Sequence, residues 1–161
     1  MTTAPGRPLA KSASRIELRD VRLAPALDRA GIVRAGRGTR IVLDEGHRWI
    51  GPLDEMVTRT LAADLAQRLP DSSIVGERDA SGRDPDVIVS VDIDRFEADA
   101  AGQAVLSANF TIRRFGRPSA LREGRIDEHV APSSPGTDAL VQALSVALGR
   151  LADRLAETLS A

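Results

Sequence analysis

The chain has 161 residues, a formal net charge of −1 at pH 7 and 42% hydrophobic residues, which suits one domain with a core of its own. Its near-zero charge, three Phe, single Trp and lack of Tyr argue against nucleic-acid binding, which uses a basic surface and stacking aromatic side chains. The absence of cysteine excludes disulfides, thiol catalysis and cysteine-ligated zinc. The sequence has neither a run of about 18 apolar residues nor the apolar centre of a signal peptide at its start.

The N-terminal part of the chain predicts a leader followed by short strands. Residues 1–14 are small and polar, with Pro and Gly among them, and predict a flexible leader or tether. Residues 15–161 then form the single domain. Alternating apolar residues predict strands at 15–19 and 21–23 and another that runs from 41 towards 50.

A helix is expected next, because Gly51-Pro52 is a typical helix start and Pro70 a typical stop. Apolar residues recur between them at steps of three and four, which predicts one amphipathic helix over about 53–69. The stripe consists of Leu53, Met56, Val57, Leu61, Leu65 and Leu69.

The middle of the chain predicts a β-meander. Residues 73–75 form a short strand, and residues 87–93 alternate between apolar and polar side chains more clearly than any other segment. A turn over 97–103 leads to a second alternating run at 106–112, so the two runs form an antiparallel hairpin. A third strand is expected at about 121–130.

The closing helix carries a leucine-rich stripe. Its residues are Val141, Leu144, Leu148, Leu151, Leu155 and Leu159, spaced nearly as in a heptad repeat. We expect the stripe to pack on the protein's own sheet rather than in an intermolecular coiled coil, which usually runs longer. The predicted fold is therefore a single α+β domain, a mostly antiparallel sheet with two main amphipathic helices packed on it.

Motifs for chemistry are sparse. The two histidines, His47 and His129, lack the spacing of a zinc site, and neither a nucleophile elbow nor a phosphate-binding loop occurs. Asp92 and Asp94 share the polar face of one predicted strand, a pattern that suits acid–base chemistry but also a solvated sheet face. We expect no catalytic residue, no cofactor and no metal, and we keep a hydrolase using these two carboxylates as the weakest alternative.

Several segments occur in an order that is similar to one protein family. They are Leu23-Ala-Pro-Ala-Leu27-Asp28-Arg29-Ala-Gly-Ile32-Val33, His47-Arg48-Trp49-Ile-Gly-Pro52-Leu53-Asp-Glu-Met56, Asp94-Arg95-Phe96-Glu97-Ala98-Asp99, Val105-Leu-Ser-Ala108-Asn-Phe110 and Leu140-Val141-Gln-Ala-Leu144-Ser145. In this order they resemble the ABC-type transport auxiliary lipoproteins (PqiC/YmbA-like), and the resemblance covers about residues 16–159.

The resemblance implies a non-enzymatic periplasmic accessory of an MCE/ABC-type lipid transport system that supports outer-membrane integrity. Its partners would be an MCE-type protein and ABC or integral-membrane transporter components. Such lipoproteins carry a signal peptide and a lipobox cysteine, which this chain lacks. Outer-membrane anchoring is therefore an expectation from the resemblance alone.

We expect the partner contacts at two places, the loop with Leu27, Asp28 and Arg29 and the start of the first helix with Arg48 and Trp49. Trp and Arg are favoured at interfaces, although Trp49 also suits a plug at the end of the core. A direct lipid-binding module, with phospholipid acyl chains between helix and sheet, is the main alternative. Assembly into a homo-oligomer stays open.

Overall fold

The computed structural model describes residues 1–9, 14–27, 31–35, 41–77, 84–115 and 120–161, and of 33–35 and 41–47 it describes the backbone alone. The elements, in chain order, are β1 (Arg15–Leu18), β2 (Arg22–Leu23), β3 (Gly31–Ala35), β4 (Ile41–Arg48), α1 (Leu53–Arg68), β5 (Ser73–Gly76), β6 (Val87–Ala98), β7 (Ala104–Arg114), β8 (Ala120–Val130) and α2 (Thr137–Ser160).

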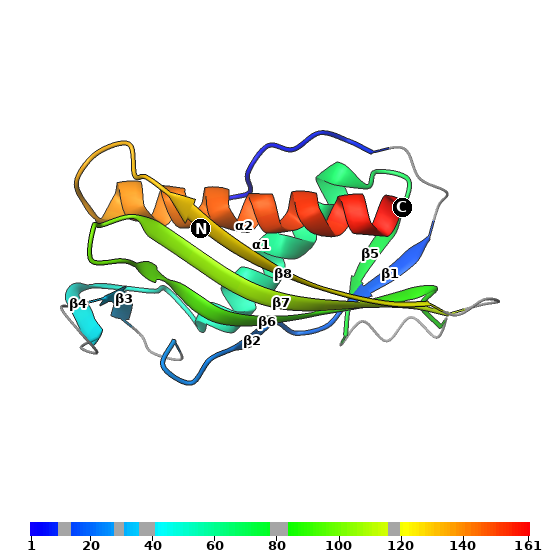
Figure 1. Ribbon diagram of the computed structural model, residues 1–161, viewed down its shortest axis with the longest axis horizontal. Coiled ribbons are helices and arrows are strands. Elements are labelled where there is room, and N and C mark those ends of the chain that lie inside the picture. The colour runs from blue at the N-terminus through cyan, green and yellow to red at the C-terminus, as the bar shows by residue number, and fades with distance from the viewer. Residues whose placement is uncertain (10–13, 28–30, 36–40, 78–83, 116–119) are drawn as a thin grey trace.

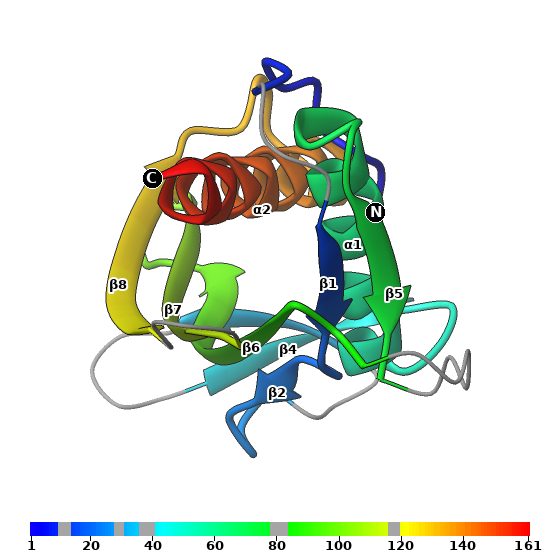
Figure 2. The same ribbon diagram turned by 90° about the vertical axis from the view of Figure 1, so that its right-hand side faces the viewer.

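Both helices lie on one face of a single curved sheet (Figures 1 and 2). The long helix α2 packs on β7 and β8, while α1 packs on β5 and against α2. One face of the sheet is therefore covered by helices, and the predicted α+β class with two main helices is confirmed.

The centre of the sheet is the antiparallel meander β6–β7–β8. Val91 of β6 is paired with Phe110 of β7, which in turn lies opposite Gly124 of β8. Alternation of buried and partly buried residues along β6 explains this arrangement, because successive side chains of a strand point to opposite faces. The predicted hairpin and the predicted third strand are both present.

The other edge of β6 pairs with three short strands in succession. β1 lies beside Val87–Val89, β2 beside Asp92–Ile93, and β3 reaches Ala98, all of them parallel to β6. β5 adds a further parallel pairing to β1, and β3 and β4 form an antiparallel pair. The long pairings of the sheet are thus antiparallel and the short ones mostly parallel.

A bulge lengthens β6 beyond its predicted end. The pairing with β7 shifts between Ile93 and Arg95, which leaves Asp94 as an extra residue in the strand. Beyond the bulge, the pairing with β7 continues to Ala98, so residues 97 and 98, predicted as the start of a turn, are strand residues. The turn itself begins at Asp99, whose N–H donates to the carbonyl of Gln103.

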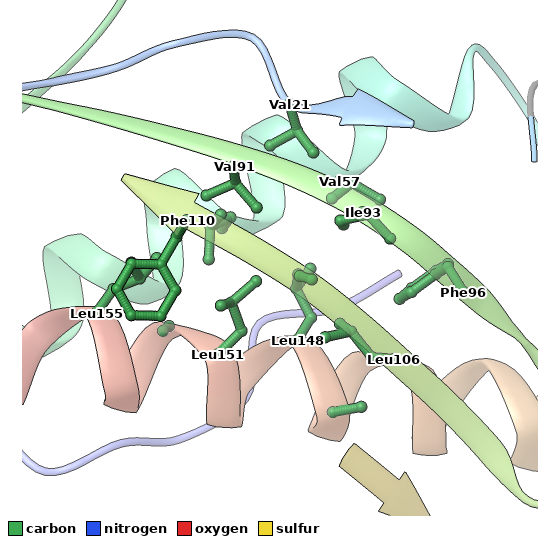
Figure 3. Close-up of a cluster of buried hydrophobic side chains, with 14 of the residues drawn as sticks. Val21, Val57, Val91, Ile93, Phe96, Leu106, Phe110, Leu148, Leu151 and Leu155 are labelled. Atoms are coloured by element: carbon green, nitrogen blue, oxygen red, sulfur yellow. The ribbon is translucent and has the colours of Figure 1, made fainter. Parts of the chain in front are cut away.

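The core lies between the helices and the sheet. The five leucines of the α2 stripe from Leu144 to Leu159 are fully buried, and Val141 packs at the margin. Figure 3 shows Leu148, Leu151 and Leu155 directed towards Leu106 and Phe110 of β7. The stripe packs on the protein's own sheet, as predicted from its length.

Candidate partner-binding surface

β3 follows the first segment expected to contact partners, β4 leads into the second, and the two strands pair with each other. Gly31, which follows the predicted contact loop, is paired with Arg48 at the end of β4. Arg48 is thereby held beside Gly31, although the two residues are 17 positions apart in the sequence.

Leu27 does not lie on this surface. The residue belongs to a turn, in which its N–H donates to the carbonyl of Ala24 at 2.8 Å. Its side chain is only 2% exposed and is part of the hydrophobic core. The burial of a leucine is favoured by the hydrophobic effect, so Leu27 anchors the turn to the core. Asp28, Arg29 and the side chain of His47 lie outside the described residues.

Arg48, Trp49 and Ile50 connect β4 to α1 and present different side chains. Arg48 is exposed, whereas Trp49 is half-buried and packs against the core. Ile50 is 97% exposed, the highest value among the exposed large hydrophobic residues of the described chain. Trp49 thus packs at the end of the core, while the exposed Ile50 next to it in the sequence is available for an apolar contact. Ile50 was not among the contact residues predicted from the sequence, although its place between Trp49 and a Gly-Pro pair was a usable signal.

The sheet face opposite the helices carries paired charges. Arg22 donates to both carboxylate oxygens of Asp92, over 2.5 and 2.9 Å, and this bidentate pair raises the pKa of the guanidinium. Asp94 accepts from Asn109 Nδ2 at 3.0 Å and is 3.4 Å from Arg125 Nη1. Both carboxylates are therefore engaged on an open face, which is the geometry of a solvated charge ladder.

The same ladder continues to Asp127. Arg125 donates to both oxygens of Asp127, at 2.9 and 3.1 Å. Hydrogen bonds from Arg125, and then from Ser107, lower the pKa of Asp127 to about 2. The stabilisation that this pair gives is present above about pH 4, the unfolded range of an aspartate, and is lost as the pH falls through about 2.

A second charged group is buried between the helices. Asp64 and Arg68 of α1 are 0% and 1% exposed. The Nη1 atom of Arg68 is 3.8 Å from Asp64 Oδ1, and its Nε donates to Asp153 Oδ1 of α2 at 2.5 Å. Burial raises the pKa of Asp64, although Arg68 and a backbone N–H act in the opposite direction. Sequence analysis missed this group, yet both residues follow a stripe leucine by three positions and so share its side of the helix.

The described residues offer little for catalysis or metal binding. A hollow of about 530 Å³ lies between the β6–β7 turn and the start of α2, and no titratable side chain lines it. Across the part of the chain that the structure describes, no three His, Asp or Glu side chains gather as metal ligands. The helices in that part are also too short or too polar to cross a membrane.

The fold and these charges define a small α+β domain with an open, ion-paired sheet face and an exposed apolar residue beside its first helix. The model of the ABC-type transport auxiliary lipoprotein component family matches residues 1–156. The chain belongs to this family. Its members are auxiliary components of transport systems, and their lipoprotein character points to the cell envelope. No curated protein sequence matches the chain.

Solved structures with the same fold have low sequence identity. An uncharacterised protein has a TM-score of 0.82 at 19% identity, covering 99% of this chain and 100% of its own. A DUF330 protein from Xanthomonas campestris has a TM-score of 0.71 at 18% identity, covering 99% and 89%. The PelC dodecamer of Paraburkholderia phytofirmans has a TM-score of 0.49 at 12% identity, covering 91% and 90%.

Proposed function

We propose that this protein is a non-enzymatic periplasmic accessory component of an MCE/ABC-type lipid transport system. In this role it is anchored to the outer membrane as a lipoprotein and supports outer-membrane integrity. The observation that carries the proposal is the family match over residues 1–156. The arrangement of Asp92 and Asp94, each engaged by an Arg or Asn on an open face, supports a role without catalysis.

The proposed partner-binding surface consists of Arg48, Trp49 and Ile50. A hydrophobic side chain as exposed as Ile50 gains about 1.5–3 kcal/mol when a partner covers it. Arg48 adds a charged donor at the rim, and the half-buried Trp49 gives the patch a rigid base. The occupant that we propose is the MCE-type protein of the transport system.

The route of the lipid is proposed to run through that partner. The space between α2 and the sheet is occupied by packed side chains, among them Phe110, Leu151 and Leu155, all at most 4% exposed (Figure 3). An acyl chain would have to displace them, which costs the packing of the core. This arrangement favours the accessory role over the direct lipid-binding alternative.

Titration of the purified protein with its cognate MCE-type protein tests the proposal. We expect a complex in native mass spectrometry, and a weakening of binding by about 10-fold or more for Ile50→Ser, since a buried isoleucine contributes roughly 1.5–3 kcal/mol. Leu121→Ser is the matched control, because Leu121 is also an exposed apolar residue, 56% exposed, on β8. Its binding should equal that of the wild type.

The single tryptophan allows a direct readout of the same surface. Fluorine-labelled Trp49 is the only labelled side chain in the protein, so its NMR resonance reports on this site alone. A shift on addition of the partner supports the surface. A folded protein that forms no complex contradicts the function, whereas a complex that leaves this resonance and the Ile50→Ser affinity unchanged contradicts the surface.

A further inference from the structure

The first nine residues lie across the two helices, on the side away from the sheet (Figures 1 and 2). The N–H of Ala4 donates to Asp64 Oδ1 at 2.9 Å, and the N–H of Leu9 donates to the carbonyl of Arg68 at 2.7 Å. On α2, Ser145 Oγ accepts a hydrogen bond from the N–H of Thr2 at 3.3 Å. The sequence predicts a flexible leader here, and the structure shows residues 1–9 of that leader seated on the domain.

Two residues of α1 bind both polar groups of the Ala4 backbone. Asp64 accepts its N–H, while Nη1 of Arg68 donates to its carbonyl at 3.3 Å. The same guanidinium donates to the carbonyl of Gly149 at 3.0 Å and pairs with Asp153. We call this group, made of Asp64, Arg68, Gly149 and Asp153, the N-terminal seat.

The seat also selects for size. A Cβ atom at Gly149 would overlap the Cβ atom of Ala4, and a Cβ atom at Gly6 would overlap the guanidinium of Arg68. Ala4 is the only residue of the segment that is buried. The seat therefore takes an extended backbone with one small side chain at its centre.

Only part of the segment is buried. Thr2, Thr3, Pro5, Arg7 and Pro8 are exposed, and the apolar contacts of the segment come from the buried Ala4 and from Met1 and Leu9, which are partly buried against the core. Arg68 keeps Asp153 and the carbonyls of α1 and α2 as partners when the segment leaves. Regions with few buried apolar contacts open at a smaller free-energy cost than the core.

One oxygen in the seat lacks a partner. Asp64 is completely inaccessible to solvent, and its Oδ2 atom has no hydrogen bond. A buried acceptor without a donor is a cost that the docked state bears and that hydration removes on opening. Pro5 acts in favour of docking. It biases Ala4 towards extended conformations in the released segment as well, so less conformational entropy is lost when the segment binds.

We propose that the N-terminal seat is a reversible binding site for the chain's own residues 1–9, which detach while the sheet and both helices stay folded. Release thus frees residues 1–9 from their contacts with α1 and α2. The inference rests on the contacts of residues 1–9 and not on the proposed function.

Amide exchange measured by NMR on the full chain tests the wild type. The N–H groups of Ala4 and Leu9 should exchange together, with protection about 100-fold or more below that of the β7 amides, which are paired on both sides by β6 and β8. Protection equal to that of β7 would overturn the proposal, because the segment would then leave only on global unfolding.

Glycine variants separate the seat from general stability. Gly149→Ala should lower the protection of Ala4 and Leu9 about 10-fold or more, while the protection of β7 stays equal or rises because alanine favours the helix. Gly6→Ala should have the same effect from the other side of the contact. Gly51→Ala is the matched control, since a Cβ atom there meets nothing within 4 Å.

A rescue variant completes the test. Ala4→Gly removes the methyl group that collides with the new side chain, so Gly149→Ala combined with Ala4→Gly should recover part of the lost protection at Leu9. Equal loss of protection at Ala4 and in β7 for Gly149→Ala would contradict a detachable segment. Unchanged protection at Ala4 in both glycine variants would contradict the size selection of the seat.

Discussion

At the residue scale, the side chain of Arg68 connects three parts of the chain, which no sequence pattern indicated. Its buried guanidinium contacts the carbonyls of Ala4, Asp64 and Gly149 and the carboxylate of Asp153. These contacts join the N-terminal segment, α1 and α2 at one point. A buried cation of this kind is stable only because several acceptors surround it.

Replacement of Arg68 by methionine should therefore destabilise the protein by about 3–5 kcal/mol, the usual cost of a buried charge left without its partner. The double variant Asp64→Leu with Arg68→Met should regain most of this loss, because it removes both charges. Urea unfolding measures both values. A cost below about 1 kcal/mol for Arg68→Met would contradict this prediction, because it would show that Asp64 is not left as an unpaired buried charge.

The pH dependence of stability follows from Asp64. Its folded pKa is raised above 3.8, mainly by burial, so its contribution is favourable below about pH 4 and is lost as the pH rises through the folded value. Wild-type stability, measured relative to Asp64→Asn, should therefore fall as the pH increases from about 4 towards 7. Urea unfolding of both proteins over this range provides the comparison. The raised pKa would be contradicted if the free energy of unfolding of the wild type increased relative to that of Asp64→Asn as the pH rises.

Sequence patterns at this scale predict burial better than they predict contacts. The apolar stripe of α1 was evident, but Asp64 and Arg68 were not, because a charged residue on a stripe becomes buried only when other elements supply its partners. Leu27 shows the reverse case. Its place in a Pro-containing loop indicated exposure, yet the turn directs it into the core.

At the element scale, α2 provides the largest part of the core. Leu151 is fully buried and faces β7 (Figure 3), whereas Val146 on the same helix is 41% exposed. The apolar stripe of α2 therefore predicted its packing face correctly.

Leu151→Ala should lower the free energy of unfolding by about 2–5 kcal/mol, because the truncation removes buried methyl groups and leaves a cavity. Val146→Ala should change it by less than about 1 kcal/mol, since a partly exposed site loses little burial. Urea unfolding of the two variants makes the comparison. Equal effects of the two substitutions would contradict the assignment of the leucine stripe as the buried face of α2.

Strand prediction succeeded where a strand alternates over many residues. The hairpin of β6 and β7 was predictable because its apolar residues alternate and a turn joins neighbouring strands. The parallel pairings of β1, β2 and β3 with β6 were not, since strands of two to five residues carry too little pattern to select a partner. The bulge at Asp94 was not predictable either, because a single extra residue does not alter the composition of the strand.

At the scale of the whole molecule, the two proposed interaction sites lie at opposite ends of α1. The partner-binding surface, Arg48 to Ile50, precedes its first residue, whereas the N-terminal seat is built on its last two turns. A helix of 16 residues is about 24 Å long. Substitutions in the seat should therefore leave partner affinity unchanged, which makes the two proposals separable.

The candidate surface was predictable only in part. Arg48 and Trp49 were identified from the residues that favour interfaces, while Ile50 became evident only from its exposure. The family was predicted from the order of several weak motifs, and the match of the family model over residues 1–156 confirms it. The partner's identity depends on a surface outside this chain, so no pattern within the chain determines it.

Site-specific photocrosslinking in cells identifies the protein that contacts Ile50. A photoreactive residue replaces Ile50 in one strain and Leu121 in another, and mass spectrometry identifies the crosslinked proteins. We predict an MCE-type component of a lipid transporter attached at position 50 and absent at position 121. Normal levels of folded protein with no transport component crosslinked at position 50 would contradict it.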